Sequence, residues 1–425
     1  VPQSGVLAAS VKYRLFGLSA RYDLGPAQLF YGFAHNKFDL PETGQVLGGQ
    51  LNVDIGINVD SHELRLASNP GHPLQWTIGA YLRKAHRQDL FEFDLFGLNE
   101  VDTTDSDARA VFGEATYSIP NTNLDLTAGL RYYYEKLSGN VLSGGVTTPL
   151  PTTPYKSWNP RFSIAWHPRK NSTIYATASK GFRAGQFQPL EAVRLGQLFG
   201  INLPPTLKQD FIWTYEVGAK ADFLHGALTA EGAAFYSDWK DVTVRIPIST
   251  TGFNGLTNSP GTHTKGVELA LFARPVKGLS LAASGSLIDA HYIGAVPGTG
   301  IVPGADVEDV AKFTSNASAD YRWPISSGIE GTARIGWQHT SPRNNTSFPN
   351  FEKGDTIDRV DARVGAEFGK VTLALFADNL TDDRGAIDYR TVQPIAPGVN
   401  DITSTRLRPR TFGIELNVDL QRPAS

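Results

Sequence analysis

TFGIELNVDL, residues 411–420, alternates between polar and apolar side chains at every position. An extended chain would place one set on each face, with Phe412, Ile414, Leu416, Val418 and Leu420 opposite Thr411, Gly413, Glu415, Asn417 and Asp419. Successive side chains of a β-strand point to opposite faces of the sheet, so this period of two predicts a strand. A sheet made of such strands separates an apolar environment from a polar one.

The same alternation recurs along the whole sequence. Residues 124–135, 213–223 and 359–368 repeat it, each with a polar or charged residue at most alternate positions. About 17 such segments can be counted between turn residues. Although 425 residues could form two or three ordinary domains, this pattern predicts one large antiparallel all-β body over residues 1–425.

The connections between the segments also alternate in length. Short turns are expected at residues 119–124, 167–172, 224–226, 275–278 and 369–370. Long loops are expected at residues 41–57, 94–106, 137–156, 187–209, 247–262, 293–310, 342–354 and 385–406. Outer-membrane barrels have short periplasmic turns and long extracellular loops. The pattern therefore predicts a transmembrane β-barrel and assigns the short turns to the periplasm.

Aromatic residues cluster near the expected strand ends. They include Tyr132, Tyr134, Trp166, Trp213, Tyr215, Tyr236, Trp239, Trp323 and Trp337. Membrane barrels carry such belts at both lipid interfaces. The alternative is that these rings fill a soluble core, but the charged opposite faces favour a watery lumen. Bacterial single-chain barrels have even strand numbers, so an odd count indicates either a strand that the pattern does not reveal or, the favoured interpretation, an N-terminal portion of the barrel that is missing here.

Composition excludes several classes of function. The net charge is −3 and cysteine is absent, which argues against nucleic-acid binding and against thiolate sites or disulfides. No run approaches the roughly 18 apolar residues of a transmembrane helix, and the mean hydropathy is −0.22. Membrane β-strands escape that test because they alternate.

Several segments resemble the C-terminal barrel of TonB-dependent outer-membrane receptors. They include LTAGLRY at 126–132, WNPRFSIAWHP at 158–168, IYATASKGFRAG at 174–185, YEVGAKADF at 215–223, and NLTD at 379–382 followed by RPRTFGIEL at 408–416. The resemblance extends over nearly the whole chain, and the last pair is the most specific.

The resemblance implies a 22-stranded barrel plugged by an N-terminal globular domain, with a TonB box ahead of the plug. Neither the plug nor the TonB box is visible, so residues 1–425 are expected to lack the plug and the first strands. It also implies a receptor in the outer membrane of a Gram-negative bacterium. The implied partners are the TonB–ExbB–ExbD complex, a small-molecule ligand such as a ferric chelate, and outer-membrane lipid and lipopolysaccharide.

Catalytic motifs are missing from the sequence, which contains no Gly-x-Ser-x-Gly elbow, Walker A loop, dinucleotide fingerprint or His-Glu-x-x-His motif. We therefore expect no enzyme activity and no cofactor. The remaining enzymatic alternative is a serine and a histidine on one wall, such as Ser61 with His62. Asp102, Asp105 and Asp107 could hold Ca²⁺, but a solvated acidic loop explains them better, and no metal site is predicted.

A ligand site is expected at the extracellular mouth. The candidate residues are Tyr133, Glu135, Arg183, Gln186, Trp239, His291, His339, Tyr389 and Arg390. Aromatic rings and arginine suit stacking on, and charge pairing with, a planar or anionic chelate. The alternative is that they line a hydrated wall without touching ligand.

The predicted function is energised import of a scarce ligand, with a ferric siderophore as the first choice. Cobalamin, an oligosaccharide or an aromatic compound are alternative ligands of such an importer. A passive porin-like channel is the alternative from another class, because it would share the strand pattern.

Overall fold

The structure is a computed structural model that describes residues 8–46, 48–248, 254–345, 352–392 and 401–419. One antiparallel sheet of 18 strands contains most of them, including the two-residue strand β1 (Ala8–Ala9), which pairs with β3. The 17 long strands follow one another around the sheet as β2 (Lys12–Asp23), β3 (Ala27–Val46), β4 (Gly49–Ser68), β5 (Leu74–Phe93), β6 (Leu98–Ile119), β7 (Leu124–Ser143), β8 (Val146–Arg169), β9 (Ser172–Arg183), β10 (Asp210–Phe223), β11 (Leu228–Lys240), β14 (Gly261–Ala273), β15 (Leu279–Tyr292), β16 (Phe313–Ser326), β17 (Ile329–Thr340), β20 (Ile357–Phe368), β21 (Val371–Asp378) and β24 (Thr411–Val418).

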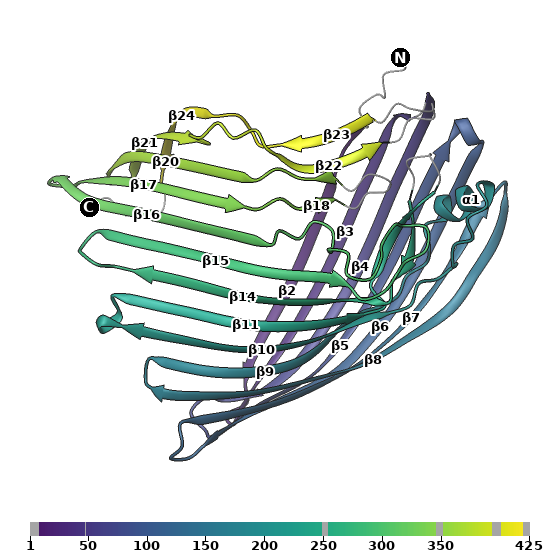
Figure 1. Ribbon diagram of the computed structural model, residues 1–425. Helices are drawn as coiled ribbons and strands as arrows, with labels where there is room; N and C mark the ends of the chain where they lie inside the picture. Colours follow the sequence, from purple (N-terminus) through teal and green to yellow (C-terminus); the bar gives the residue numbers. More distant parts are fainter. Residues whose placement is uncertain (1–7, 47, 249–253, 346–351, 393–400, 420–425) are drawn as a thin grey trace.

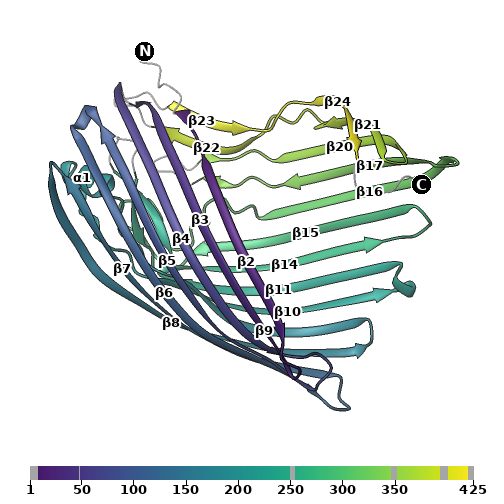
Figure 2. The same ribbon diagram turned by 180° about the vertical axis from the view of Figure 1, so that it is seen from behind.

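The sheet curves around a central lumen. Strands β2–β7 lie behind β10–β20 in Figure 1 and in front of them in Figure 2. Neighbouring strands are all antiparallel, so the first and last of the 17, β2 and β24, run in the same direction. Within the described residues, β2 and β24 do not pair with each other. The predicted barrel architecture and the predicted strand count are both confirmed.

The faces of the strands also agree with the sequence. On β24, Phe412, Ile414 and Leu416 are 69%, 72% and 64% exposed on the outer face, where lipid would contact them. On the inner face, Glu415 accepts hydrogen bonds from Arg363. Leu420 lies outside the described residues.

Three of the expected long loops are instead largely strand. Within them, residues 41–46, 49–57, 98–106, 137–143 and 146–156 extend the β3–β4, β5–β6 and β7–β8 hairpins, whose strands have 20 to 24 residues. A membrane crossing needs only about 9–11 residues. These hairpins therefore rise well above the membrane, and the expectation of loops there was wrong.

The polarity of the alternation reverses where the hairpins leave the membrane. In β7, Leu130 and Tyr132 face outward within the membrane, but farther up Lys136 faces outward while Leu137 and Val141 are buried inside. Above the hydrocarbon the outer face meets water, so the apolar side chains turn inward. From the sequence, the strand was expected to end at this reversal, because one face of each strand was assumed to be apolar along its whole length.

The expected short turns are confirmed. Strands β6 and β7 meet at residues 119–124 and β8 and β9 at residues 169–172, and the one-turn helix η2 (Leu224–Gly226) joins β10 to β11. The other one-turn helix, η1 (Asp94–Phe96), joins β5 to β6 at the extracellular end. Short and long connections therefore lie at opposite ends of the barrel.

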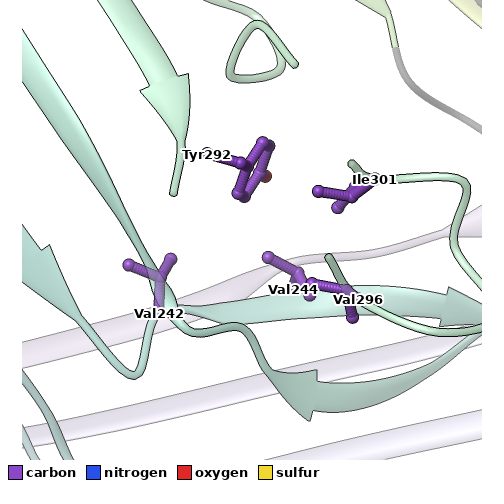
Figure 3. Close-up of a cluster of buried hydrophobic side chains, with 5 residues drawn as sticks. All are labelled: Val242, Val244, Tyr292, Val296 and Ile301. Atoms are coloured by element: carbon purple, nitrogen blue, oxygen red, sulfur yellow. The ribbon is translucent and has the colours of Figure 1, made fainter. Parts of the chain in front are cut away.

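The remaining extracellular connections contain the helix α1 (Leu190–Leu198) and the small hairpins β12–β13 (Thr243–Pro247, Asn254–Asn258), β18–β19 (Asn344–Asn345, Glu352–Lys353) and β22–β23 (Ala386–Val392, Asp401–Arg406). Two apolar clusters hold these connections together. Figure 3 shows the first, in which Val242 and Val244 pack with Tyr292, Val296 and Ile301. Among the described residues, no helix has the length and apolar character needed to cross a membrane.

NLTD and RPRTFG, the most specific pair in the sequence, contact each other directly. The Asn379 amide donates to the carbonyl oxygen of Arg408 at 2.8 Å. The backbone N–H of Arg410 donates to Asp382 at 3.0 Å, and the Arg384 guanidinium contacts the same carboxylate. These bonds lower the pKa of Asp382 below its ordinary value of 3.8. The motif therefore fixes how the last strand enters the sheet.

Candidate ligand site

Two groups of polar side chains lie on the inner wall at the extracellular end of the lumen. The first centres on Glu135, which is buried although it carries a carboxylate. It accepts hydrogen bonds from the Arg83 guanidinium at 2.8 Å, from the Tyr133 hydroxyl at 2.8 Å and from the Ser106 hydroxyl. A buried carboxylate requires such donors. They come from β5, β6 and β7, and the group fastens these three strands together.

The second group centres on Asp210, the first residue of β10, which is also buried. Arg183 pairs with it across the β9–β10 ladder, with Nε at 2.8 Å and Nη2 at 2.6 Å from one carboxylate oxygen. The indole N–H of Trp239 on β11 donates to the same carboxylate at 3.0 Å. Asp210 therefore orients both a guanidinium and an aromatic ring.

Arg183 remains accessible despite this pairing. Its guanidinium carbon lies 4.5 Å from the centre of the Trp239 ring, and its side chain is 55% exposed. A guanidinium presents five N–H donors, and a stacked arginine can add a planar or anionic ligand on its free side. The group can thus bind such a ligand without any proton transfer.

The two groups adjoin each other through β9. The ring of Phe182, next to Arg183, lies 4.7 Å from the ring of Tyr133. Just beyond, the Tyr155 hydroxyl donates to the carbonyl oxygen of Leu207 at 2.9 Å. Gly185 permits this close approach, because an added Cβ would lie 2.1 Å from that oxygen. Residues from β7, β8 and β9 therefore share one packed region.

The extracellular connections pack over the same wall. In the second apolar cluster, Ala192 and Leu195 of α1 pack with Leu203 and Ile248. Arg194 of α1 donates to the buried Glu100 of β6 at 3.1 Å. Gln188 donates to the carbonyl oxygen of Leu256 and accepts from its N–H. These contacts hold α1 and the β12–β13 hairpin close to the candidate site.

Comparison with known proteins gives the family. The chain matches the family model described as "TonB dependent receptor-like, beta-barrel" over residues 5–380. The chain belongs to this family of TonB-dependent receptors. As a barrel of this family, the receptor lies in the outer membrane of a Gram-negative bacterium.

Solved structures agree with the fold. The receptor aligns with the ferric yersiniabactin uptake receptor FyuA from Yersinia pestis, with a TM-score of 0.80 and 16% identity over 98% of this chain and 63% of that one. The siderophore receptor PiuA from Acinetobacter baumannii gives 0.74 and 14% over 98% and 66%. The copper transporter OprC gives 0.74 and 13% over 97% and 66%. The chain thus spans less than two thirds of the length of these structures.

The structure brings four of the predicted site residues together in the receptor and separates the others. Tyr133, Glu135, Arg183 and Trp239 lie in the two inner-wall groups. Gln186 is exposed just beyond β9, where its carbonyl oxygen accepts from the N–H of Leu207. Tyr389 and Arg390 lie in β22.

His291 and His339 face the outside of the receptor barrel. Along β15 and β17 they share a face with Leu287 and Ile335, which are 55% and 52% exposed. His291 contacts Asp289 and lies 3.1 Å from Asp306, and His339 lies 2.9 Å from Asp358. The structure therefore places these two histidines apart from the inner-wall groups.

The residues considered for a calcium site and for a serine–histidine pair do not come together in the structure. On β6, Asp102 faces inward whereas Asp105 and Asp107 face outward. The described residues contain no group of three or more histidines and carboxylates suited to a metal ion. Ser61 and His62 are neighbours in β4 and point to opposite faces, and His62 contacts the Tyr31 hydroxyl at 2.9 Å.

Arg83, Ser106 and Asp210 belong to the inner-wall groups but were missed in the sequence. Asp210 begins a strand immediately after a long connection, and its partner Arg183 ends the strand before that connection. The position of these two residues at facing strand ends is the sequence signal that could have identified Asp210. No such signal distinguishes Arg83 and Ser106, because almost every strand has an inward-facing polar residue.

Proposed function

We propose that the receptor imports its ligand in an energised, TonB-dependent way, and that the ligand is a ferric siderophore. The observation that carries this proposal is the exposed guanidinium of Arg183, held by Asp210 over the Trp239 ring at the extracellular end of the lumen. A positive charge on an aromatic platform attracts a planar or anionic chelate.

The names of similar structures support this choice of ligand class without deciding it. Those named above are a ferric yersiniabactin uptake receptor, a siderophore receptor and a copper transporter. Low sequence identity limits this likeness to the fold. The ligand therefore has to be identified by experiment.

Energised transport also requires parts beyond the described barrel. We propose that an N-terminal plug and TonB box couple the receptor to TonB, ExbB and ExbD. We also propose that an odd number of further strands closes the wall between β2 and β24, because these two edge strands run in the same direction. Unpaired backbone groups facing lipid cost several kcal/mol each, so the wall has to be closed.

The test is uptake of iron-labelled siderophores by cells that carry the full-length gene, with and without functional TonB. Arg183→Gln removes the positive charge, and we expect it to weaken binding roughly 10- to 100-fold, as for loss of a charge-assisted contact. Lys240→Gln is the matched control, because Lys240 also pairs with an aspartate, at 2.9 Å, but faces outward beside Trp239.

Each outcome separates the proposed functions. TonB-dependent uptake that Arg183→Gln weakens and Lys240→Gln preserves would support the proposal. TonB-dependent entry of cobalamin, an oligosaccharide or an aromatic compound, with no siderophore transported, would replace the ligand. Entry of solutes independent of TonB would favour the porin-like channel.

A further inference from the structure

Arg131 on β7 is an inward-facing arginine that has no carboxylate partner. Within the described residues, no carboxylate lies within 4.0 Å of its guanidinium group. Nine other inward-facing arginines of the barrel sheet do have such a partner, as Arg83 has Glu135 at 2.8 Å. A charged group in a protein wall is usually paired. The isolation of Arg131 therefore distinguishes it from the rest of the lumen wall.

The strand register explains this isolation. Arg131 stands opposite Phe112 on β6 and Asn159 on β8, and neither of these residues carries a charge. The diagonal neighbour on β6 is Glu114, whose carboxylate accepts a hydrogen bond from Arg161 at 2.8 Å. Arg131 therefore adds an uncompensated positive charge to the inner face.

Three aromatic rings surround the guanidinium group of Arg131. Its carbon lies 5.6 Å from the centre of the Tyr81 ring and 5.9 Å from those of Phe112 and Tyr133. Gly79 on β5 makes room for the Phe112 ring, because an added Cβ would lie 2.4 Å from it. Cation–π attraction extends to about 6 Å, so the rings orient the guanidinium without neutralising it. We call Arg131 with these three rings the Arg131 cage.

The cage leaves hydrogen-bond donors of Arg131 free. Its Nε is buried, and no acceptor in the described part of the chain contacts it. Buried polar groups without a partner are rare in proteins. A guanidinium presents its N–H donors in a planar fork that matches the two oxygens of a carboxylate. Because Arg131 is only half-buried on the inner face, a carboxylate in the lumen can reach it.

The Arg131 cage lies deeper in the lumen than the candidate ligand site. Gly129, Arg161 and Ser179 form one row of the strand register. Toward the extracellular end, Arg131 lies two residues above this row and Arg183 lies four residues above it. With about 3.4 Å per residue and about 4.8 Å per strand, the two arginines are roughly 12 Å apart, and Arg131 is on the periplasmic side.

The two positions also differ in charge. At the mouth, Asp210 compensates Arg183, and above the cage Glu135 compensates Arg83. The charge of Arg131 is not compensated, and the low dielectric constant of the wall strengthens its attraction for an anion. An anion released from Arg183 is therefore attracted toward Arg131, away from the extracellular side.

We propose that the Arg131 cage is a second binding site of the receptor, and that it takes an aromatic carboxylate. The guanidinium of Arg131 donates to both carboxylate oxygens, and the ring of the ligand contacts the aromatic side chains of the cage. During import, the cage holds the ligand after its release from Arg183. Only this transport step rests on the proposed function, because the anion site itself requires no transport.

The test is a fluorine NMR titration of the purified full-length receptor with para-fluorobenzoate, and with neutral para-fluorobenzamide as the matched probe. Arg131→Gln should weaken para-fluorobenzoate binding roughly 10- to 100-fold, as for loss of charge-assisted hydrogen bonds. Arg65→Gln is the control. Arg65 lies in the same row of the register and is 4.5 Å from the centre of the Phe30 ring, but it pairs with Glu63 at 2.8 Å.

Two further variants keep the proposal testable if Arg131→Gln fails to fold. Arg131→Lys retains the charge without the planar fork, and Phe112→Leu retains the arginine but removes one ring, so each should weaken para-fluorobenzoate binding several-fold. The proposal is overturned if Arg131→Gln binds para-fluorobenzoate as tightly as the unchanged receptor, if Arg65→Gln loses as much affinity, or if para-fluorobenzamide binds equally well. Destabilisation by Arg131→Gln with unchanged binding would also overturn it, and would assign Arg131 to a carboxylate of the plug.

Uptake of an iron-labelled siderophore separates the site from the proposed function. Arg131→Gln should slow TonB-dependent uptake several-fold, whereas Arg65→Gln should not. Unchanged uptake by a variant that has lost para-fluorobenzoate binding would overturn the transport step. Arg131-dependent binding of para-fluorobenzoate, without TonB-dependent uptake of any siderophore, would support the site and contradict the proposed function.

Discussion

Replacing Tyr133 with phenylalanine removes one hydrogen-bond donor from a buried carboxylate and leaves the packing intact. The ring contact with Phe182 at 4.7 Å is retained, and Glu135 keeps its bonds from Arg83 and Ser106. A hydrogen bond to a charged group contributes about 1.5–3 kcal/mol. We expect Tyr133→Phe to lower the free energy of unfolding by about 2 kcal/mol.

The shift in melting temperature should be small because the chain is long. Unfolding entropy of about 2.1 cal/mol/K per residue gives roughly 0.9 kcal/mol/K for 425 residues. A loss of about 2 kcal/mol then lowers the melting temperature by only about 2 °C. Urea unfolding in lipid vesicles, followed by tryptophan fluorescence, is therefore the better assay.

Tyr134→Phe is the matched control. Tyr134 is the next residue of β7 and faces outward, away from Glu135. Loss of the Tyr134 hydroxyl should change the free energy of unfolding by less than about 0.5 kcal/mol. Equal losses for the two variants, or no loss for Tyr133→Phe, would refute the view that the buried carboxylate depends on the tyrosine hydroxyl.

Three further substitutions test the fold. Leu130→Arg, on the lipid face near the middle of β7, should destabilise the barrel by about 2–4 kcal/mol, whereas Thr127→Arg on the inner face should be tolerated; folding into vesicles measures both. Gly185→Ala should force the carbonyl of Leu207 away and destabilise by about 1–3 kcal/mol, detected as faster proteolysis of residues 184–209. Asp382 has a folded-state pKa below 3.8, so its stabilising bonds act fully above that pH and are lost as pH falls through the lower, folded value. Asp382→Asn should therefore melt below the unchanged receptor at pH 6, by a difference that shrinks as the pH falls through the folded value, and a pH-independent difference would contradict this.

Much of the wall could be predicted because each strand is specified locally. Where one face meets lipid and the other meets a watery lumen, every second residue reports its environment, as in residues 411–418. The prediction was wrong at residues 137–156 because it assumed that the apolar face stays on one side. Leu137 and Val141 are as apolar as Leu130, but they lie above the membrane and point inward.

The candidate site was predicted less completely. From the sequence, Tyr133 could be recognised as an aromatic residue and Arg183 as a charged residue near the extracellular mouth. Asp210, which holds Arg183 in place, lies 27 residues from Arg183 in the sequence, across a long connection. His291 looked equivalent to the other candidates in the sequence. Its side of the wall depends on the register of β15, which is set by pairing with neighbouring strands.

By itself, the sequence predicted a membrane β-barrel, its orientation in the membrane, and the residues of each membrane-spanning strand that face lipid. These are consequences of alternation and turn length, both of which are local. Only the tertiary structure decided which polar groups meet on the inner wall and which connections pack over them. Such contacts join residues far apart in the chain, and they depend on strand register and curvature that no local pattern records.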